Sequence, residues 1–111
     1  MKLLTKEILR RLPPIGSTAE LKPDLVKVPL KLFNPSGAGT WYITEYDPEE
    51  RLAFGFANLG DPIMAELGYV SLDELESVRL PFGLKIERDM SFDPNTTLKE
   101  VMDTIKSGGH I

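Results

Sequence analysis

The sequence predicts a single α+β domain: a twisted antiparallel sheet of about four strands, arranged as a meander, with helices packed on one face. Two patterns support this fold class. The middle of the chain alternates apolar and polar residues between clusters of turn residues, which is typical of strands, and both ends carry helix-start patterns. The length of 111 residues and the composition, 41% hydrophobic and 27% charged, are those of one ordinary globular domain.

The chain is expected to begin with a short helix. Thr5 is the predicted N-cap, because a hydroxyl at this position can accept a hydrogen bond from the first helical turn. Leu4 and Leu9 have the spacing of a hydrophobic staple. The pair Pro13-Pro14 should end this helix after few turns.

The first predicted strand covers residues 26–33. Four aliphatic residues in it alternate with Lys27, Pro29, Lys31 and Phe33, which is the period of a half-buried strand. Proline cannot donate a hydrogen bond to a neighbouring strand, so Pro29 favours a position at the edge of the sheet. The two lysines should then face water.

Two further strands complete the predicted meander. Residues 40–46 follow a turn cluster and are rich in β-branched and aromatic side chains. Side-chain alternation places Trp41 and Ile43 on one face of this strand, and Tyr42, Thr44 and Tyr46 on the other. Residues 51–57 alternate large with small side chains. The small set leaves room for something to pack closely; it comprises Ala53, Gly55 and Ala57.

A fourth strand and a second helix are expected next. Residues 66–70 form the strand, which leads directly into a capping-box pattern at Ser71. The helix after it should run to about Arg79. Residues 84–92 favour extended over helical structure.

The last predicted helix starts at Thr97, where the capping box recurs. The pair Gly108-Gly109 ends it. Because chain ends beyond such a pair are usually poorly ordered, we expect a flexible tail from about residue 107. Residues 1–111 are therefore expected to form one domain that ends in this tail.

Charge is distributed unevenly along the chain. The net charge is −4, and the first 33 residues carry seven basic and three acidic residues, whereas the remainder carries six and fourteen. The overall sign opposes phosphate binding, so we expect the basic first third to lie against the acidic body. Nucleic acid is therefore not an expected partner.

The termini and the cysteine content predict a cytoplasmic protein. The N-terminal stretch becomes charged at Lys6 and Glu7, so no signal peptide is expected. No apolar run approaches the length of a transmembrane helix, so no membrane partner is expected. The chain has no cysteine, which fits a reducing compartment and excludes disulfides and thiol chemistry.

Residues for catalysis are scarce in the sequence. The one histidine, His110, lies beyond the last glycine pair, so neither a Ser-His-Asp triad nor a zinc site of the usual ligands is expected. Gly37-Ala38-Gly39 lacks the continuation of a phosphate-binding loop and favours a turn. We therefore predict no catalytic residues, no metal site and no cofactor.

Carboxylates are the remaining candidates for chemistry. Glu45 and Asp47 would share a face of one strand, as would the two acids on either side of Arg88. Such pairs could hold a hard cation such as magnesium, or divide acid and base roles. Acids at strand ends are usually solvated, however, and Arg88 supplies a counter-ion. We therefore favour a structural acidic and ion-pair cluster, which comprises Glu45, Glu66, Glu87, Arg88 and Asp89.

Tyrosines are the candidate contacts for a partner. Amphipathic rings often anchor partner molecules, although rings on alternating strands more often belong to a core. If both faces of the sheet carry aromatic rings, one face is covered by helices and the other is open to a partner. The candidates are Tyr42, Tyr46 and Tyr69.

Six ordered motifs add a family resemblance. They are residues 3–8, 12–14, 41–47 (WYITEYD), 54–55, 66–75 (ELGYVSLDEL) and 86–89 (IERD). Together they resemble the bacterial family called domain of unknown function 2958, from Leu3 to about Leu98. The resemblance implies a small stand-alone protein of the kind often found on plasmids, phages and integrated mobile elements. It assigns no catalytic residues, and the Gly-Gly-His-Ile tail lies outside its pattern.

We therefore expect a non-enzymatic accessory or interaction domain that binds another protein. Two alternatives stay open. A carboxylate-based metal-dependent hydrolase would require convergence of Glu45, Asp47, Glu66, Glu87 and Asp89 in one pocket. A nucleic-acid-binding module would use Lys27, Lys31, Tyr42 and Tyr46.

Overall fold

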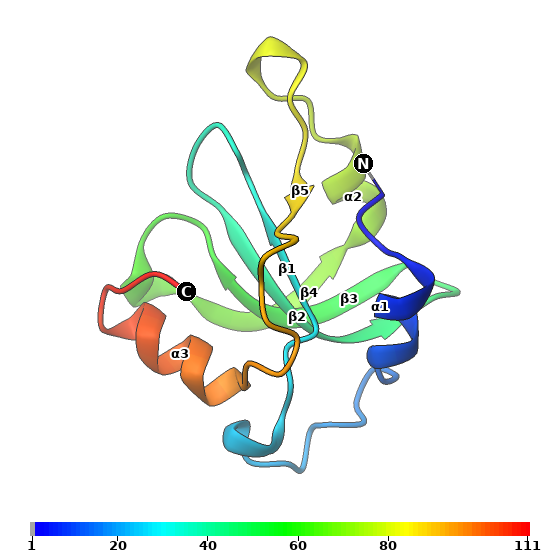
Figure 1. The fold of residues 1–111 in the computed structure, drawn as a ribbon, viewed down its shortest axis with the longest axis vertical. Coiled ribbons are helices and arrows are strands. Elements are labelled where there is room, and N and C mark those ends of the chain that lie inside the picture. The colour runs from blue at the N-terminus through cyan, green and yellow to red at the C-terminus, as the bar shows by residue number, and fades with distance from the viewer. Residues whose placement is uncertain (1) are drawn as a thin grey trace.

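A five-stranded antiparallel sheet forms the centre of the computed structural model, which describes residues 2–111. The strand order is β4-β3-β2-β1-β5, so the first four strands form a meander (Figure 1). The strands are β1 (Leu30–Phe33), β2 (Thr40–Asp47), β3 (Leu52–Asn58), β4 (Glu66–Ser71) and β5 (Glu87–Arg88). The helices are α1 (Lys6–Arg11), α2 (Leu72–Ser77) and α3 (Leu98–Lys106), with 3-10 turns η1 (Pro23–Leu25), η2 (Pro62–Met64) and η3 (Pro81–Gly83). The predicted α+β class is confirmed, and one short strand is added.

The helices start at the capping residues that the sequence predicts. The Thr5 hydroxyl accepts a hydrogen bond at 3.2 Å from the N–H three residues later. Thr97 and Glu100 form a reciprocal capping box, in which the Glu100 N–H donates to the Thr97 hydroxyl at 3.1 Å. Ser71 caps α2, which ends earlier than predicted because Val78 is already extended. Within residues 2–111, no helix is long and apolar enough to cross a membrane.

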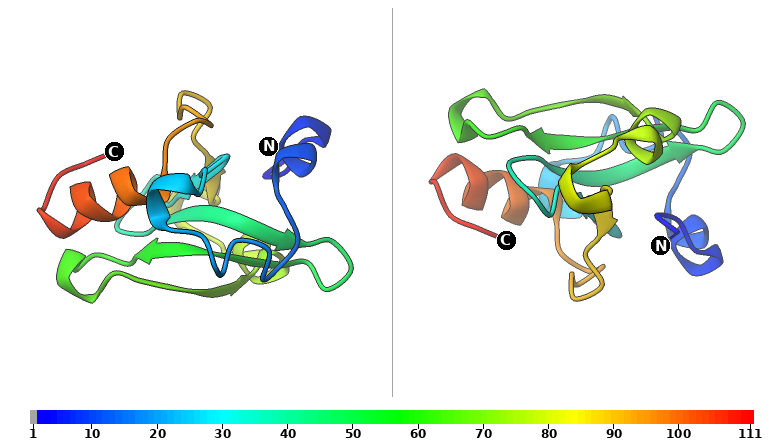
Figure 2. Two further views of the ribbon diagram at one scale, coloured as in Figure 1. Left: turned by 90° about the horizontal axis from the view of Figure 1, so that it is seen from below. Right: turned by 90° about the horizontal axis from the view of Figure 1, so that it is seen from above.

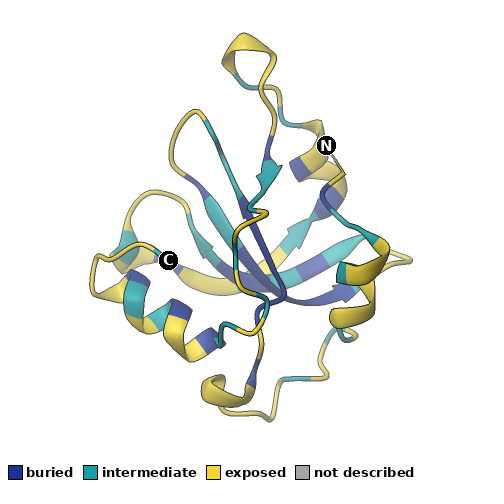
Figure 3. Ribbon diagram, viewed as in Figure 1, coloured by how far each residue is buried: buried dark blue, intermediate teal, exposed yellow. Residues whose placement is uncertain are grey.

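Apolar side chains pack into two clusters, which lie on opposite faces of the sheet because Ile43 belongs to one and its neighbour Tyr42 to the other. Figure 3 shows buried segments in the central strands and in α2 and α3. The first cluster joins strand residues such as Leu30 and Ile43 to Leu72 and Leu75 of α2, and residues around α1 pack against it. The prediction that helices pack on one face of the sheet holds for α1 and α2. Helix α3 packs against the second cluster, on the other face. Helices α1 and α3 also lie at opposite ends of the sheet (Figure 2). The second cluster comprises Val26, Val28, Tyr42, Phe56, Ala65, Leu98, Val101 and Ile105.

The prediction that Pro29 places the first strand at a sheet edge is wrong. Strand β1 begins at Leu30, the residue after Pro29, and it pairs with both β2 and β5. Pro29 therefore stands outside the ladder, where its missing N–H removes no sheet hydrogen bond. The alternation also breaks here, because Val28 packs in the second cluster and Leu30 in the first. Upstream of Pro29 the chain pairs elsewhere: the Val28 N–H donates to the Thr96 carbonyl at 2.8 Å.

A β-bulge in β2 changes which side chains share a face. The register with β3 shifts between Ile43 and Glu45, so Thr44 is the extra residue. Tyr46 consequently packs with Ile43 in the first cluster. The sequence predicts instead that Tyr46 shares a face with Tyr42, which packs in the second cluster. The inserted residue is the reason that simple alternation fails beyond this point.

Candidate functional site

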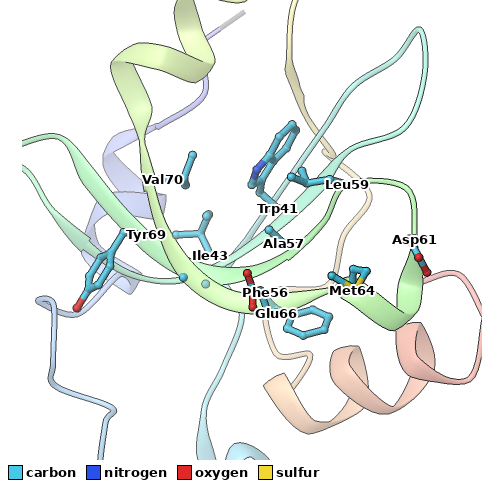
Figure 4. Close-up of a pocket in the computed structure, with 12 residues that line it drawn as sticks. Trp41, Ile43, Phe56, Ala57, Leu59, Asp61, Met64, Glu66, Tyr69 and Val70 are labelled. Atoms are coloured by element: carbon cyan, nitrogen blue, oxygen red, sulfur yellow. The ribbon is translucent and has the colours of Figure 1, made fainter.

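An apolar hollow of about 420 Å³ lies on strands β3 and β4. Figure 4 shows Trp41, Ile43 and Val70 on the same side of these strands, around the hollow. Leu59 and Met64, from the connection between β3 and β4, line one end. The strand residues beneath have little or no side chain: Gly55, Ala57 and Gly68. Two of these belong to the small set that the sequence singles out.

Two facing glycines keep the floor of the hollow open. Gly55 of β3 pairs directly with Gly68 of β4, so no side chain fills this point of the sheet face. A Cβ added to Gly55 would overlap the carbonyl oxygen of Tyr42, whereas a Cβ added to Gly68 would meet no heavy atom within 4 Å. The fold therefore requires glycine at residue 55, and Gly68 leaves space that the fold does not use.

The outer edge of β4 lies beside the hollow. Among the described strands, β4 pairs with β3 alone, so the main-chain groups of its other edge can bond to an added strand. Tyr69 on β4 is 64% exposed, and its ring packs edge-on against Phe54 with the ring centres 5.0 Å apart. Figure 4 shows Tyr69 pointing away from the side on which Trp41 stands. Exposed apolar groups therefore flank β4 on both faces.

The rim of the hollow is acidic. Asp61 and Glu66 are the charged residues among those that line it, and both are exposed. Asp61 also caps η2, accepting a hydrogen bond from the Ile63 N–H at 3.0 Å. Beside them, Leu59 and Met64 are 68% and 72% exposed. An apolar interior with a negative rim suits an apolar side chain that has basic neighbours.

The structure separates the three tyrosines predicted to contact a partner. Tyr42 is fully buried in the second cluster, where its hydroxyl donates to the main-chain oxygen of Ile111 at 3.0 Å, and burial raises its pKa. Tyr46 is buried in the first cluster, and burial raises its pKa as well. Tyr69 is exposed. Burial thus removes Tyr42 and Tyr46 from the surface that a partner could reach.

Glu45 is an internal anchor. Its side chain is buried, and its carboxylate accepts hydrogen bonds from the Gly16 N–H at 2.8 Å, the Thr18 N–H at 2.8 Å and the Thr18 hydroxyl. Burial alone would raise the pKa of Glu45, but these hydrogen bonds stabilise its charged form and hold the pKa below its ordinary value. Glu45 therefore fastens the segment after α1 to strand β2.

The other acids of the predicted cluster lie apart. Glu66 is on β4 and Glu87 is on β5, at opposite edges of the sheet. Asp89 pairs with Lys31 at 3.4 Å, and Arg88 donates to a main-chain oxygen near the N-terminus. Among residues 2–111, no three Asp, Glu or His side chains lie close enough to hold a metal ion. The strand order thus separates Glu66 on β4 from Glu45 on β2 and from Glu87 on β5.

Lys31 is the candidate residue whose observed environment differs most from the predicted one. The sequence predicts that it faces water, but it is 4% exposed. Its ammonium donates to the main-chain oxygen of Ile111 at 2.7 Å, and it lies 5.7 Å from the centre of the Tyr42 ring. Ile111 at the end of the chain therefore lies against the sheet, whereas residues 107–110 are exposed, and the predicted flexibility of this tail stays a prediction. No local pattern could indicate this contact, because its partners are 80 residues apart.

Comparisons with known proteins bear on the motif resemblance. The family model described as "Protein of unknown function (DUF2958)" matches residues 3–111, so the match extends through the C-terminal segment that the motifs leave out. No curated protein and no solved structure matches the chain. Because the matched range covers almost the whole sequence, the chain belongs to the DUF2958 family.

Proposed function

We propose that this chain is a non-enzymatic accessory domain that binds another protein, and that the hollow on β3 and β4 takes an apolar side chain of that protein. The observation that carries the proposal is the hollow itself. Its volume of about 420 Å³ falls in the range of ligand pockets, and the facing glycines leave its floor open. Trp41 beside it offers an aromatic surface for an inserted side chain.

The edge of β4 supports the same function. An extended segment of a partner can add to this edge through main-chain hydrogen bonds. Side chains alternate along such a segment, so every second one would lie on the side of the sheet that carries the hollow. Main-chain pairing would then supply affinity, and the hollow would select the anchoring side chain.

The chemistry around the hollow also favours binding over covalent catalysis. Asp61, Glu66 and Tyr69 are the ionisable residues that line it. A nucleophile with an adjacent base is not among the lining residues, and the two acids stand at the rim. The preferred anchor is therefore an aromatic or aliphatic side chain next to Lys or Arg.

We further propose, from the family resemblance, that the protein acts in the cytoplasm as an accessory protein of a bacterial mobile element. The motifs that carry the resemblance support this role. Gene neighbourhoods of family members test it: plasmid, phage or integration genes should recur beside them. Recurrent housekeeping neighbours would contradict the role.

A peptide-display selection tests the interaction site. The wild-type domain should select extended peptides with an apolar anchor beside basic residues. Gly68→Leu should weaken binding of the selected peptides at least about tenfold, because the new side chain projects from the glycine floor into the hollow. The backbone at Gly68 tolerates a Cβ, so this variant should fold.

Gly37→Leu is the matched control for this selection. Gly37 lies in the turn between β1 and β2, and a Cβ added there has its nearest neighbour at 3.8 Å. The Gly37→Leu variant should bind the selected peptides with the same affinity as the wild type. Equal peptide affinity of Gly68→Leu and wild type would rule out the hollow as the binding site.

A further inference from the structure

The loop between α2 and β5 carries a fully exposed aromatic ring. Phe82 is 100% exposed in the 3-10 turn η3 of this loop, and the loop protrudes beyond the sheet in Figure 1. Its φ is 62°, in the left-handed region that bulky residues rarely adopt. Strained positions of this kind cluster where proteins bind ligands or partners. The Phe82 loop, residues 80–84, is therefore a candidate contact outside the hollow.

Main-chain hydrogen bonds close the base of the Phe82 loop. The Leu80 N–H donates to the Leu84 carbonyl at 3.0 Å, and the Leu84 N–H donates to the Pro81 carbonyl at 3.2 Å. Pro81 further restricts the backbone next to Phe82. A ring presented on such a closed turn loses little conformational freedom when it binds. The loop thus presents Phe82 in a conformation prepared for insertion.

The hollow has room for this ring. A cavity of about 150 Å³ already holds a benzene molecule in a protein interior. The hollow offers about 420 Å³, and its glycine floor allows close approach. Trp41 at its wall can pack against an inserted aromatic ring.

The charges around the loop and the hollow are opposite in sign. Arg79 and Lys85 flank the Phe82 loop and are exposed. Asp61 and Glu66 line the hollow and are exposed too. Opposite charges around an apolar contact favour the correct pairing and set its orientation. The Phe82 loop therefore has the features that the hollow requires, an apolar side chain with basic neighbours.

We infer that copies of this chain associate with one another, with Phe82 of one copy inserted into the hollow of the next. This inference rests on the proposed function, because it uses the same hollow and names a second copy as its occupant. The contact is small, so the association is weak and depends on concentration. A partner protein with a similar anchor would compete with it.

Sedimentation of the full chain tests this inference, from about 10 µM to about 1 mM because the association is weak. The mean mass of the wild type should rise with concentration. Phe82→Ser removes the ring and Gly68→Leu obstructs the floor of the hollow, so each should lower the association constant at least about tenfold. Leu25→Ser removes a side chain that is 64% exposed elsewhere, and should leave the constant unchanged.

Mixing the two deficient variants is the decisive measurement. Phe82→Ser retains an open hollow, and Gly68→Leu retains the ring. An equimolar mixture should therefore regain association, which also shows that both variants are folded. A mixture that stays monomeric, or a wild type that stays monomeric over the whole range, would overturn the inference. Binding to anionic vesicles that requires Phe82, without self-association, would overturn it as well and assign the loop to a membrane surface.

The peptide selection separates this inference from the proposed function. If the wild type binds peptides in a way that depends on Gly68 but does not self-associate, the inference fails and the proposed function stands. If self-association depends on Phe82 but not on Gly68, the hollow is not the receptor, and the inference fails for that reason. If Gly68→Leu changes neither binding nor association, both fail.

Discussion

The two faces of β3 differ in the size of their side chains. One face presents Leu52, Phe54 and Phe56, and Phe56 is buried in the cluster beneath α3. The other face presents small residues, and two of them form part of the hollow: Gly55 and Ala57. At these residues, the strand packs Phe56 beneath α3 on one side and leaves the hollow above Gly55 and Ala57 on the other. The face that carries the hollow also contributes Ile43 and Ala53 to the first cluster, but Gly68 leaves space there that no side chain occupies. Substitutions at Phe56 and at Gly68 should therefore separate stability from binding.

The largest loss of stability is expected from a substitution on the face of β3 with large side chains. Phe56 is 1% exposed, so Phe56→Ala removes a fully packed ring and should lower the free energy of unfolding by about 3 to 5 kcal/mol. Denaturant unfolding followed by circular dichroism measures this change. A loss below about 1 kcal/mol would break the comparison, because the large-residue face would then contribute little.

A second large loss of stability is expected when one methyl group is added at Gly55, next to the hollow. Gly55→Ala places a Cβ against the Tyr42 carbonyl oxygen, and main chain cannot move aside as a side chain can. The free energy of unfolding should fall by about 3 kcal/mol. Gly68→Ala is the matched control, since its Cβ meets no neighbour. Equal melting temperatures for the two variants would show that the register between β2 and β3 differs from that described.

An intermediate loss of stability is expected when Glu45 is changed. Its side chain joins the segment after α1 to strand β2 through hydrogen bonds. Glu45→Gln removes the charge that three hydrogen bonds stabilise, and should lower the free energy of unfolding by about 2 kcal/mol at neutral pH. Urea unfolding of the variant and the wild type measures the difference.

The same pair of proteins should respond differently to acid. The pKa of Glu45 is lowered in the folded protein, so the unfolded chain takes up the proton first as the pH falls. The contribution of Glu45 is therefore complete above its ordinary pKa of about 4.3 and decreases as the pH falls through the lower, folded value. The stability gap between wild type and Glu45→Gln should shrink over this interval. A gap that widens in acid would contradict the assigned shift.

The smallest effect on stability is expected where binding should change most. Gly68→Leu extends into open space, so the free energy of unfolding should change by no more than about 0.5 kcal/mol. Thermal melting beside the peptide-binding assay tests both properties in one variant. Strong destabilisation would show that the space at Gly68 serves packing, and stability and binding would then not be separable at this residue.

Local patterns in the sequence predict much of this fold. The strands near residues 40–46 and 51–57 and the helix starts at Thr5 and Thr97 depend on neighbouring residues, so alternation and capping chemistry reveal them. The small residues of β3 indicate room on one face. That this room becomes a hollow depends on the pairing of Gly55 with Gly68, and cross-strand register is not visible in either strand alone.

The features that sequence patterns miss depend on distant contacts or single-residue shifts. Glu45 binds residues 27 and 29 positions earlier, and Lys31 contacts a residue 80 positions later. One inserted residue, Thr44, moves Tyr46 to the other face of the sheet. Pro29 needs only to stand one residue before the ladder to permit an interior strand. None of these contacts and irregularities changes the spacing of apolar residues along the sequence, so periodicity cannot reveal them.

The facing glycines also have a consequence for local motion. Cross-strand side-chain pairs stabilise a sheet, and Gly55 and Gly68 supply none at the point where they meet. Strand β4 has one neighbouring strand, whereas β2 has two. Amide hydrogens of β4 should therefore exchange with solvent at a lower opening free energy than those of β2, which hydrogen exchange can measure residue by residue. Transient detachment of β4 would widen the hollow and admit anchoring side chains of different sizes.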